Sequence, residues 1–237
     1  MLPRVARNGE FPMKRVNIGC GGSPTCGWYN YDNSPAVRLA KHPLLTWALD
    51  RLRLLNKIQK QSIICIRKDT SSNIMWADAT KGIPLPDNSV EVLYTSHMVE
   101  HLDRDEIRTF LKEAIRVLIP LGIIRIVVPD LEIFARQYIA DGDADIFMRK
   151  THLGRQKPKT FRDKVQYVLV GDRHHQWMFD GRSMILLLSS MGFKNPQVLP
   201  PGSTTIPNPG ELDLCERKED SVYVEAYAPD PVRDAVP

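Results

Sequence analysis

The stretch RVNIGCGG at residues 15–22 decides the fold, because a short apolar strand runs directly into a glycine-rich turn. A turn of this kind, at Gly19 and Gly21, lets the backbone approach a ligand closely. A second strand is expected at residues 28–31, and it ends at Asp32, whose carboxylate can accept hydrogen bonds from a diol. The stretch therefore predicts two strands whose carboxyl ends carry ligand-binding groups.

The same pattern continues along the chain. Three further strands are expected, each followed by polar or turn residues: 73–76 before Asp78, 90–94 before Ser96 and His97, and 123–128 before Pro129-Asp130. One polar residue after a strand can simply cap a loop, and a lone glycine pair is weak evidence. Such groups after four successive strands favour a ligand site, because ligands bind at the carboxyl ends of strands in an open parallel sheet.

Helix-like segments alternate with these strands, which predicts an α/β domain with a largely parallel sheet. Residues 105–118 place apolar side chains at helical spacing, and Asp103 or Asp105 is expected to cap the start of this helix. A second helix is predicted over 181–191, with Gly192 as its stop.

Two late strands complete the expected sheet, at 196–199 and 221–227. The second follows a loop rich in proline and glycine, so we expect it to be an antiparallel strand at the sheet edge.

One domain is expected over residues 1–237, with insertions at about 36–72 and 131–180 and a frayed tail at 229–237. The later insertion is long enough for a lid or a binding element over the site.

The first insertion contains residues 37–60, which we interpret as a basic amphipathic helix interrupted near Pro43. Its apolar side was assigned to Leu44, Leu45, Leu52, Leu55 and Ile58. Such a helix either covers the core or rests on an anionic membrane surface.

Composition excludes several classes of protein. Hydrophobic residues make up 43% and charged residues 25% of the 237 residues, which is ordinary for a folded globular chain. Apolar runs such as 184–188 are far shorter than the roughly 20 residues that cross a bilayer. Residues 1–14 lack the apolar core of a secretory signal, so a cytoplasmic protein is expected. The sequence predicts no particular oligomeric state.

The net charge of +4 is mild, but its distribution is uneven. Residues 149–164 contain seven Lys or Arg and one acid, Asp163. Three interpretations stay open for this basic segment: a solvated face of a lid, a site for an anionic acceptor such as a nucleotide sugar or lipid-linked sugar, and an RNA site. Nucleic acid ranks last, because little aromatic interleaving accompanies the charges.

Cysteine and histidine spacing gives no sign of a metal centre. Cys20, Cys26, Cys65 and Cys215 form no CxxC pair and are expected to be reduced. His101 lies one helical turn after His97, but no carboxylate of matching spacing accompanies the two, so no metal site is predicted.

Specific motifs resemble those of class I S-adenosylmethionine-dependent methyltransferases. The motifs are VNIGCG at 16–21, GWYNYD at 27–32, DATK at 78–81, LPDNSV at 85–90, SHMVEHL at 96–102 and RVL at 116–118. The resemblance covers about residues 14–130. It is nearest to the "type 11" methyltransferases, including members associated with polysaccharide biosynthesis, to which VPDLE at 128–132 and HQWMFD at 175–180 are similar.

The resemblance implies a Rossmann-like sheet of seven strands, mostly parallel with an antiparallel last strand, and helices on both faces. It also implies S-adenosylmethionine as cofactor and S-adenosylhomocysteine as product. By this resemblance Gly19, Cys20 and Gly21 lie beside the methionine part of the cofactor. Asp32 holds the ribose, Asp78 and Ala79 lie along the adenine, and Ser96 and His97 approach the methyl group.

The sequence departs from the family pattern at three places. Asn17 stands where an acid is common, which weakens the expected contact with the cofactor ammonium. Residues 21–29 are too few for a full crossover helix, so one short turn must serve. Leu121-Gly122 replaces the commoner Pro-Gly-Gly, in a turn away from the chemistry.

Histidine is the natural base for a hydroxyl acceptor, because its pKa lies near neutrality. His97 is the first candidate, although a purely shape-giving role in the cofactor pocket stays open. His101 and His175 are further candidates, with His174-His175 facing the acceptor if the 131–180 insertion folds over the strand ends. Glu100 is expected to support its loop instead of reacting. Trp28 and Trp177 are expected to pack in the core more readily than to stack on a sugar.

We therefore predict a methyltransferase acting on an oxygen of a saccharide or related small molecule, with an anionic small molecule or glycan as the expected substrate. The alternatives are a non-enzymatic binding module that keeps this fold, and a methyltransferase that acts on RNA through residues 149–164.

Overall fold

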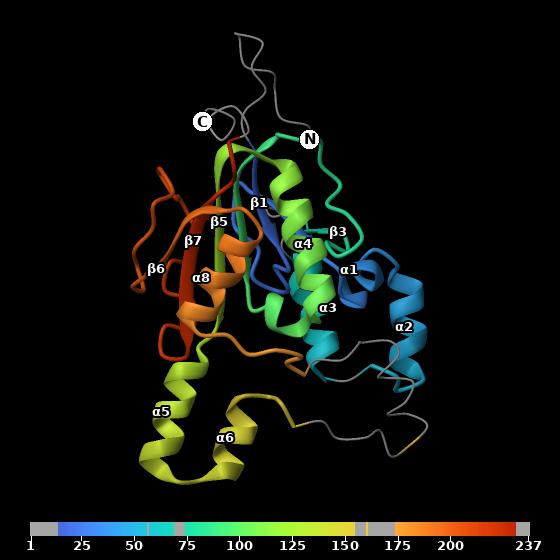
Figure 1. Cartoon of the computed structure of the whole chain (residues 1–237). Helices are drawn as coiled ribbons and strands as arrows, with labels where there is room; N and C mark the ends of the chain where they lie inside the picture. The colour runs from blue at the N-terminus through green and yellow to red at the C-terminus, as the bar shows by residue number, and fades with distance from the viewer. Residues whose placement is uncertain (1–13, 56, 69–73, 155–159, 161–173, 231–237) are drawn as a thin grey trace.

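A seven-stranded sheet forms the centre of the molecule in the computed structural model, which describes residues 14–55, 57–68, 74–154, 160 and 174–230 (Figure 1). The strands lie in the order β3-β2-β1-β4-β5-β7-β6. Their bounds are β1 Lys14–Ile18, β2 Tyr29–Asp32, β3 Ile74–Trp76, β4 Val90–Ser96, β5 Leu118–Pro129, β6 Lys194–Leu199 and β7 Ser221–Tyr227.

The first five strands are parallel, and β7 is antiparallel to both β5 and β6. Strand order reverses between β1 and β4, so their carboxyl ends flank the crevice in which open α/β sheets bind ligands. The Rossmann-like prediction with an antiparallel last strand is confirmed. The expected place of β7 at the sheet edge is wrong, because β7 lies between β5 and β6, and β6 is the edge strand.

The helix before β5 has the predicted length but lies one residue earlier, and the strand after it is longer than predicted. Helix α4, Arg104–Val117, begins with a capping box in which Asp103 accepts the N–H of Glu106 and Glu106 accepts the N–H of Asp103. It ends one residue early because Ile119 precedes Pro120, and a residue before proline disfavours helical backbone.

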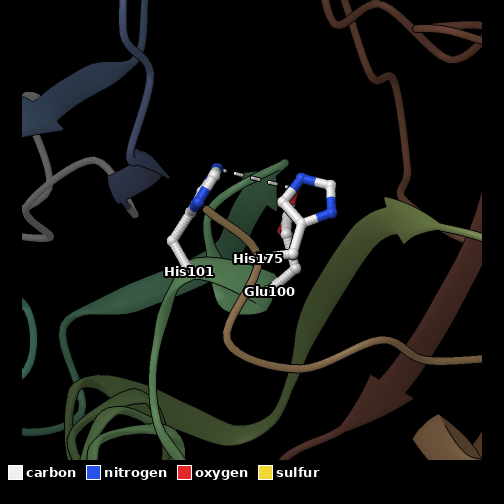
Figure 2. A group of neighbouring side chains, drawn as sticks. All are labelled: Glu100, His101 and His175. Atoms are coloured by element: carbon white, nitrogen blue, oxygen red, sulfur yellow. Dashed lines mark ion pairs between the residues drawn. The ribbon is translucent and has the colours of Figure 1, made fainter. Parts of the chain in front are cut away.

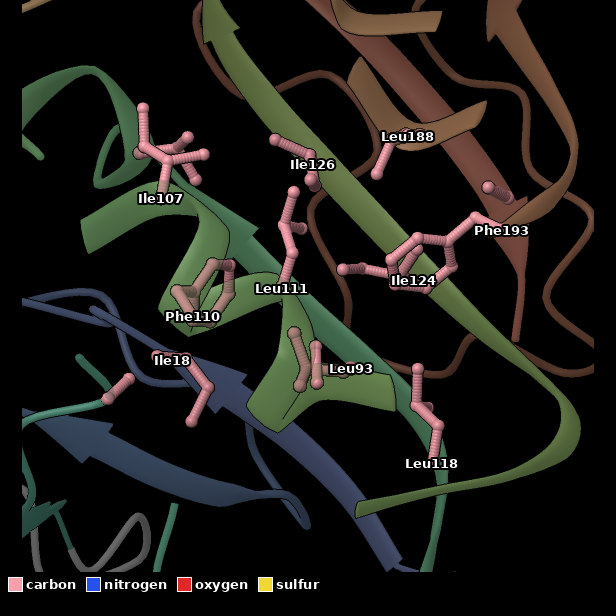
Figure 3. Close-up of a cluster of buried hydrophobic side chains, with 14 of the residues drawn as sticks. Ile18, Leu93, Ile107, Phe110, Leu111, Leu118, Ile124, Ile126, Leu188 and Phe193 are labelled. Atoms are coloured by element: carbon pink, nitrogen blue, oxygen red, sulfur yellow. The ribbon is translucent and has the colours of Figure 1, made fainter. Parts of the chain in front are cut away.

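One face of the sheet is covered by α4 and by α8, Gly181–Ser190 (Figure 3). The face of α4 that we predicted is buried, with Phe110 and Leu111 fully enclosed. Helix α8 buries Met184 and Leu188 in the same cluster, and its chain turns at Gly192, as expected. This cluster is the main core of the domain.

The opposite face is covered in two parts. Near β3, Val37 of α1 packs with Ile74 and Cys20. Ile74 is the register partner of Asn30 in β2, so the two side chains lie on the same face of the sheet. Helices therefore lie on both faces, as predicted. Further along, the loop before β7 covers β4 and β5 with Ile206 and Leu212.

The 37–60 segment is not one interrupted amphipathic helix. It contains α1 Pro35–Ala40, α2 Pro43–Arg51 and the start of α3 Lys57–Lys68. The predicted apolar side also fails, because Leu44, Leu45 and Leu52 are exposed and only Leu55 is buried among those whose side chains are described. The side chain of Ile58 lies outside the described residues.

The second insertion begins as two helices that lie beyond the carboxyl end of β5 (Figure 1). These are α5 Leu131–Asp141 and α6 Ala144–Lys150, joined at Gly142 in the left-handed conformation. Most of the basic segment 149–164 lies outside the described residues, and so does the tail from residue 231. The role of the 131–180 insertion as a lid stays a prediction. Within the described residues, no helix combines the length and apolar character needed to cross a membrane.

A buried ion pair crosses from β5 to β7. Arg125 Nη1 lies 2.6 Å from Glu225 Oε1, and both side chains are at most 1% exposed. Burial alone raises the pKa of the Glu225 carboxyl, but hydrogen bonds from Thr204, Thr205 and Arg125 hold that pKa below its ordinary value. The pair therefore stays charged inside the fold and ties the loop before β7 to the sheet.

Breaking this pair should destabilise the domain strongly. Arg125→Leu leaves a buried carboxylate without its cation, and we expect a loss of about 3–5 kcal/mol in the free energy of unfolding. Urea unfolding measures this. The matched control is Arg108→Leu, whose exposed pair with Asp105 contributes at most about 1 kcal/mol. Equal losses in the two variants would contradict this account of the pair.

Candidate active site

The glycine turn after β1 lies against the loop after β4. The N–H groups of Gly19 and Cys20 donate to the Tyr31 carbonyl oxygen at 2.8 and 3.2 Å, which ties the turn to β2. Gly19 has a φ of +73°, and a Cβ there would lie 2.6 Å from Cγ of Met98. Only glycine therefore allows the two loops to approach this closely. At Gly21 a Cβ would meet no atom within 4 Å, so the space beside this residue is open.

Asp32 holds the glycine turn from the end of β2. Its two carboxylate oxygens accept the N–H groups of Gly21 and Ser34, both at 2.8 Å, and the residue is 7% exposed. A carboxylate has about four lone-pair sites, so acceptor capacity remains for a bound diol. The predicted placement of Asp32 beside the turn is confirmed.

The loop between β1 and β2 contains no helix, as its length predicted. The buried side-chain amides of Asn17 and Asn30 hold the loop that joins these two parallel strands. Asn17 Nδ2 donates to Thr25 Oγ1 at 3.0 Å, while Asn30 accepts from the Thr25 N–H and donates to the carbonyls of Thr25 and Trp28. Asn17 thus braces the loop, and its contact with a cofactor stays a prediction.

Asp78 lies two residues beyond the end of β3. Although partial burial favours the neutral acid, hydrogen bonds from Lys81 and Thr80 lower the pKa of Asp78 below its ordinary value. The neighbouring Ala79 is 7% exposed. The carboxylate is therefore charged at neutral pH, while Ala79 belongs to the buried core.

His97 follows Ser96, the last residue of β4, and has a φ of +50°. A non-glycine residue in this region is uncommon, and here it points the side chain toward the start of β7. The ring Nε2 lies 3.0 Å from Ser221 Oγ, and Nδ1 lies 3.3 Å from Glu100 Oε1. The imidazole is 8% exposed, so both ring nitrogens face protein groups.

Glu100 lies at the centre of a histidine cluster, and its expected role as a support of this loop stays a prediction. It belongs to the short helix η1, Val99–His101, and its side chain is 1% exposed. Neither carboxylate oxygen has a hydrogen-bond partner among the described residues. Besides His97, Nε2 of His101 and Nε2 of His175 each lie 3.9 Å from Glu100 Oε1 (Figure 2).

His175 reaches this cluster because its segment binds the Glu100 backbone. The N–H groups of Gln176 and Trp177 donate to the Glu100 carbonyl oxygen at 2.7 and 3.2 Å. The chain after residue 173 therefore crosses the strand ends beside β4. This arrangement brings His175, but not His174, to the carboxylate.

Burial lowers the pKa of His175 to about 4, with further lowering from His101 and His152. The attraction of Glu100 opposes this shift but does not reverse it. His175 is therefore a neutral imidazole at neutral pH. His152, which the sequence analysis did not single out, also lies beside His175, with the two ring centroids 5.3 Å apart.

Trp28 and Trp177 differ in how deeply they are buried. Trp28 packs edge-on to Tyr94 in the smaller core, as expected. Trp177 is 44% exposed, so its expected core packing is wrong, and the Arg104 guanidinium lies 4.6 Å from its ring centroid. Its backbone is held at Glu100, which leaves the indole at the surface beside the histidine cluster.

Comparison with known proteins gives one family match. Residues 16–126 match the family model described as a methyltransferase domain. No match is found among curated proteins.

Among solved structures the chain is similar to a SAM-dependent methyltransferase from Methanosarcina mazei, at 14% identity over 92% of each chain with a TM-score of 0.47. It is also similar to one from Mesorhizobium loti, at 14% identity over 95% of this chain and 93% of that one, with a TM-score of 0.47.

The residues along the sheet edge fit S-adenosylmethionine, the cofactor of this domain. Open space lies beside Gly21, and the charged Asp78 and the Asp32 carboxylate end neighbouring strands. The hydroxyl of Thr95, a fully buried residue beside Gly19, has no partner among the described residues. An edge with two carboxylates, a glycine turn and an unpaired hydroxyl suits a polar nucleoside ligand.

Removing the charge of Asp32 should weaken cofactor binding. Asp32→Asn keeps the size of the side chain but loses hydrogen bonds to a charged acceptor, each contributing about 1.5–3 kcal/mol. Calorimetry should therefore show affinity for S-adenosylmethionine falling by roughly 10- to 100-fold. Asp145→Asn, an exposed carboxylate on α6, is the control and should bind as the wild type does. Unchanged affinity in Asp32→Asn would remove Asp32 from the cofactor site.

Proposed function

We propose that this chain, whose residues 16–126 form a methyltransferase domain dependent on S-adenosylmethionine, methylates a hydroxyl oxygen of a saccharide or related small molecule. The observation that carries the proposal is His97, held between the Ser221 hydroxyl and the buried Glu100 carboxylate at the end of β4. A histidine with one nitrogen on a carboxylate and the other on a hydroxyl is the arrangement of a general base.

The proposed cofactor contacts follow the sheet edge. Gly19, Cys20 and Gly21 would lie beside the methionine part, Asp32 would bind the ribose, and Asp78 with Ala79 would border the adenine. Ser96 and His97 would lie toward the sulfonium. When bound, the sulfonium supplies an electrophilic methyl group and leaves as a neutral thioether.

The protein's own task is then alignment and proton transfer. His97 accepts the proton at Nε2 by way of Ser221, whose Oγ lies 3.0 Å from that nitrogen: the Ser221 hydroxyl takes the acceptor's proton as it gives its own to Nε2. Glu100 stabilises the imidazolium that forms, because its Oε1 lies 3.3 Å from Nδ1. His101 and His175 border the same carboxylate and complete the acceptor side of the site.

A saccharide acceptor is supported by the surroundings of this base. The exposed indole of Trp177 offers an apolar ring face beside the cluster, the kind of surface that packs against sugar rings. Basic residues begin at Arg149 and Lys150 on α6, which suits an anionic acceptor. The similarity of residues 128–132 and 175–180 to methyltransferases of polysaccharide biosynthesis points the same way.

A screen for methyl gain tests the proposed acceptor class. The protein, S-adenosylmethionine and one acceptor at a time are incubated, and mass spectrometry records the addition of one CH2 unit. We expect the gain on sugar nucleotides or lipid-linked glycans. A gain on RNA alone would favour the RNA alternative, and no cofactor binding would favour a non-enzymatic binding module.

On the acceptor that the screen finds, His97→Ala should slow turnover by about 10²–10⁴-fold, the usual contribution of a general base. Calorimetry should show affinity for S-adenosylmethionine nearly unchanged. The control, His42→Ala, removes an exposed histidine at the start of α2 and should leave both values unchanged. Equal turnover in His97→Ala and wild type would exclude His97 as the base.

A lipid surface is the proposed partner of α2 and its flanks. Here four large apolar side chains form what we call the α2 patch: Leu44 is 85% exposed, Leu45 50%, Trp47 65% and Leu52 68%. Exposed cations lie near these residues in the chain, among them Lys41, Arg51, Arg53 and Lys57. Exposed apolar side chains with a tryptophan and neighbouring cations complement an anionic bilayer surface. Such docking would suit a lipid-linked acceptor.

Vesicle binding tests the α2 patch. We expect the protein to sediment with vesicles containing phosphatidylglycerol and to be released by salt. Leu44→Ser with Trp47→Ser should weaken binding at least about 10-fold, because burying each side chain contributes about 1.5–3 kcal/mol. The matched control is Ile139→Ser, an 81% exposed residue on α5. Absence of wild-type binding, or equal binding by the double variant, would overturn this partner.

A further inference from the structure

We propose that Glu100, His101 and His175 bind one divalent transition-metal ion, and that a hydroxyl oxygen of the methyl acceptor completes its coordination. The first half stands on the geometry of these three residues alone. The second half rests on the proposed function.

The three side chains present electron-pair donors to one point. One carboxylate oxygen of Glu100 and one ring nitrogen of each histidine all lie within 4.8 Å of one another. Nε2 of His101 and Nε2 of His175 each lie 3.9 Å from Oε1 of Glu100. Figure 2 shows the two imidazoles brought to the carboxylate from η1 and from the later segment. No other cluster of three such groups occurs among the residues that the structure describes.

Hydrogen bonds at the far side of each ring direct the Nε2 lone pairs toward this point. Nδ1 of His101 lies 3.2 Å from the His174 carbonyl oxygen, which only accepts hydrogen bonds, so this nitrogen carries the proton. Nδ1 of His175 likewise lies 3.3 Å from the thioether sulfur of Met178. In the neutral rings both Nε2 atoms are then unprotonated. Partners of this kind orient metal-binding histidines.

Without a cation, this arrangement is costly. Glu100 is 1% exposed, and neither of its oxygens accepts a hydrogen bond among the described residues. Two imidazole lone pairs facing such a carboxylate add repulsion instead of compensation. A buried charge in this position requires a counter-ion or a proton donor.

The distances between the Glu100 oxygen and the two imidazole nitrogens are close to those in an occupied metal site. Donor atoms bound to a tetrahedral ion at about 2.1 Å lie about 3.4 Å apart. The Glu100 oxygen lies 3.9 Å from each imidazole nitrogen, so these two pairs must each close by about half an ångström. The two imidazole donors lie within 4.8 Å of each other and must also move closer. Small side-chain rotations supply this movement, because His101 and Glu100 are neighbours on η1.

The donor set selects the class of ion. Two imidazoles and one carboxylate suit Zn²⁺, Mn²⁺ or Fe²⁺, whereas Mg²⁺ and Ca²⁺ prefer oxygen alone. Three protein ligands also leave coordination positions open, as in catalytic metal sites. A bound ion would lower the pKa of a coordinated hydroxyl and so deliver the acceptor oxygen as a better nucleophile.

One competing explanation uses the same carboxylate. A protonated His97, whose Nδ1 lies 3.3 Å from Glu100 Oε1, would compensate the charge without any ion. That arrangement does not explain why His101 and His175 also direct Nε2 toward Glu100. The two explanations differ in whether the free protein takes up a metal.

Metal titration of the tag-free full chain tests the site directly. Calorimetry with MnCl₂ and with ZnCl₂, in the absence of cofactor and acceptor, should show one ion bound per chain. Electron paramagnetic resonance of Mn²⁺ counts the bound ion independently. MgCl₂ should bind far more weakly. No stoichiometric binding of either transition metal by the wild type would overturn the proposal.

Variants then locate the ion. Glu100→Gln, His101→Gln and His175→Gln should each weaken affinity at least about 10-fold, the smallest loss seen when even an outer partner of a metal ligand is removed. His42→Gln, an exposed histidine on another helix, is the control for adventitious binding and should bind as wild type. Urea unfolding without metal checks each fold, and His101, at 33% side-chain exposure, is the substitution that disturbs packing least. Binding that all three variants retain would place the ion elsewhere and overturn the site.

Activity separates this proposal from the function it rests on. Loss of methyl transfer on chelation, restored by Mn²⁺ or Zn²⁺, supports the acceptor half of the proposal. Full transfer after chelation would overturn that half and leave the proposed function standing. Stoichiometric metal binding with no methylated saccharide would overturn the proposed function and leave the metal site standing.

Discussion

Two backbone hydrogen bonds to one carbonyl oxygen hold the candidate site together. The Glu100 carbonyl accepts the N–H groups of Gln176 and Trp177, which fixes a late segment of the chain against the loop after β4. This contact brings His175 beside a carboxylate 75 positions earlier in the chain. Because backbone groups make the bonds, the position of the segment depends on its path and hardly on its side chains. The chemistry of the cluster is therefore built on an element of tertiary structure.

The cofactor side of the site depends on a second close approach. The turn at Gly19 touches Met98, so the loops after β1 and β4 share one wall. Met98 lies between His97 and the helix that carries Glu100, which places the glycine turn and the histidine cluster on either side of a single residue. A reaction between a ligand at the turn and an acceptor at the cluster needs this adjacency, because a methyl group is transferred only between atoms in direct contact.

Buried charge distinguishes two parts of the molecule. The Arg125–Glu225 pair supports the sheet, and its carboxylate accepts hydrogen bonds from Arg125 and from the hydroxyls of Thr204 and Thr205. Glu100 is just as deeply buried but lacks hydrogen bonds among the described residues. Structural carboxylates are normally satisfied inside a protein, and unsatisfied ones occur where function requires them. The contrast within one chain is the physical reason for assigning chemistry to Glu100 and stability to Glu225.

The sequence by itself determined the strands from β1 to β5, the glycine turn and the acids at the strand ends, because hydrophobic period and turn residues are local signals. It also predicted the missing helix between residues 21 and 29 by counting the residues available. Tertiary structure alone decided the place of β7 inside the sheet, the exposure of Leu44 and Leu52, and the meeting of Glu100 with His175. Each depends on how distant segments pack against one another, and helical or strand spacing carries no information about partners far away in the chain.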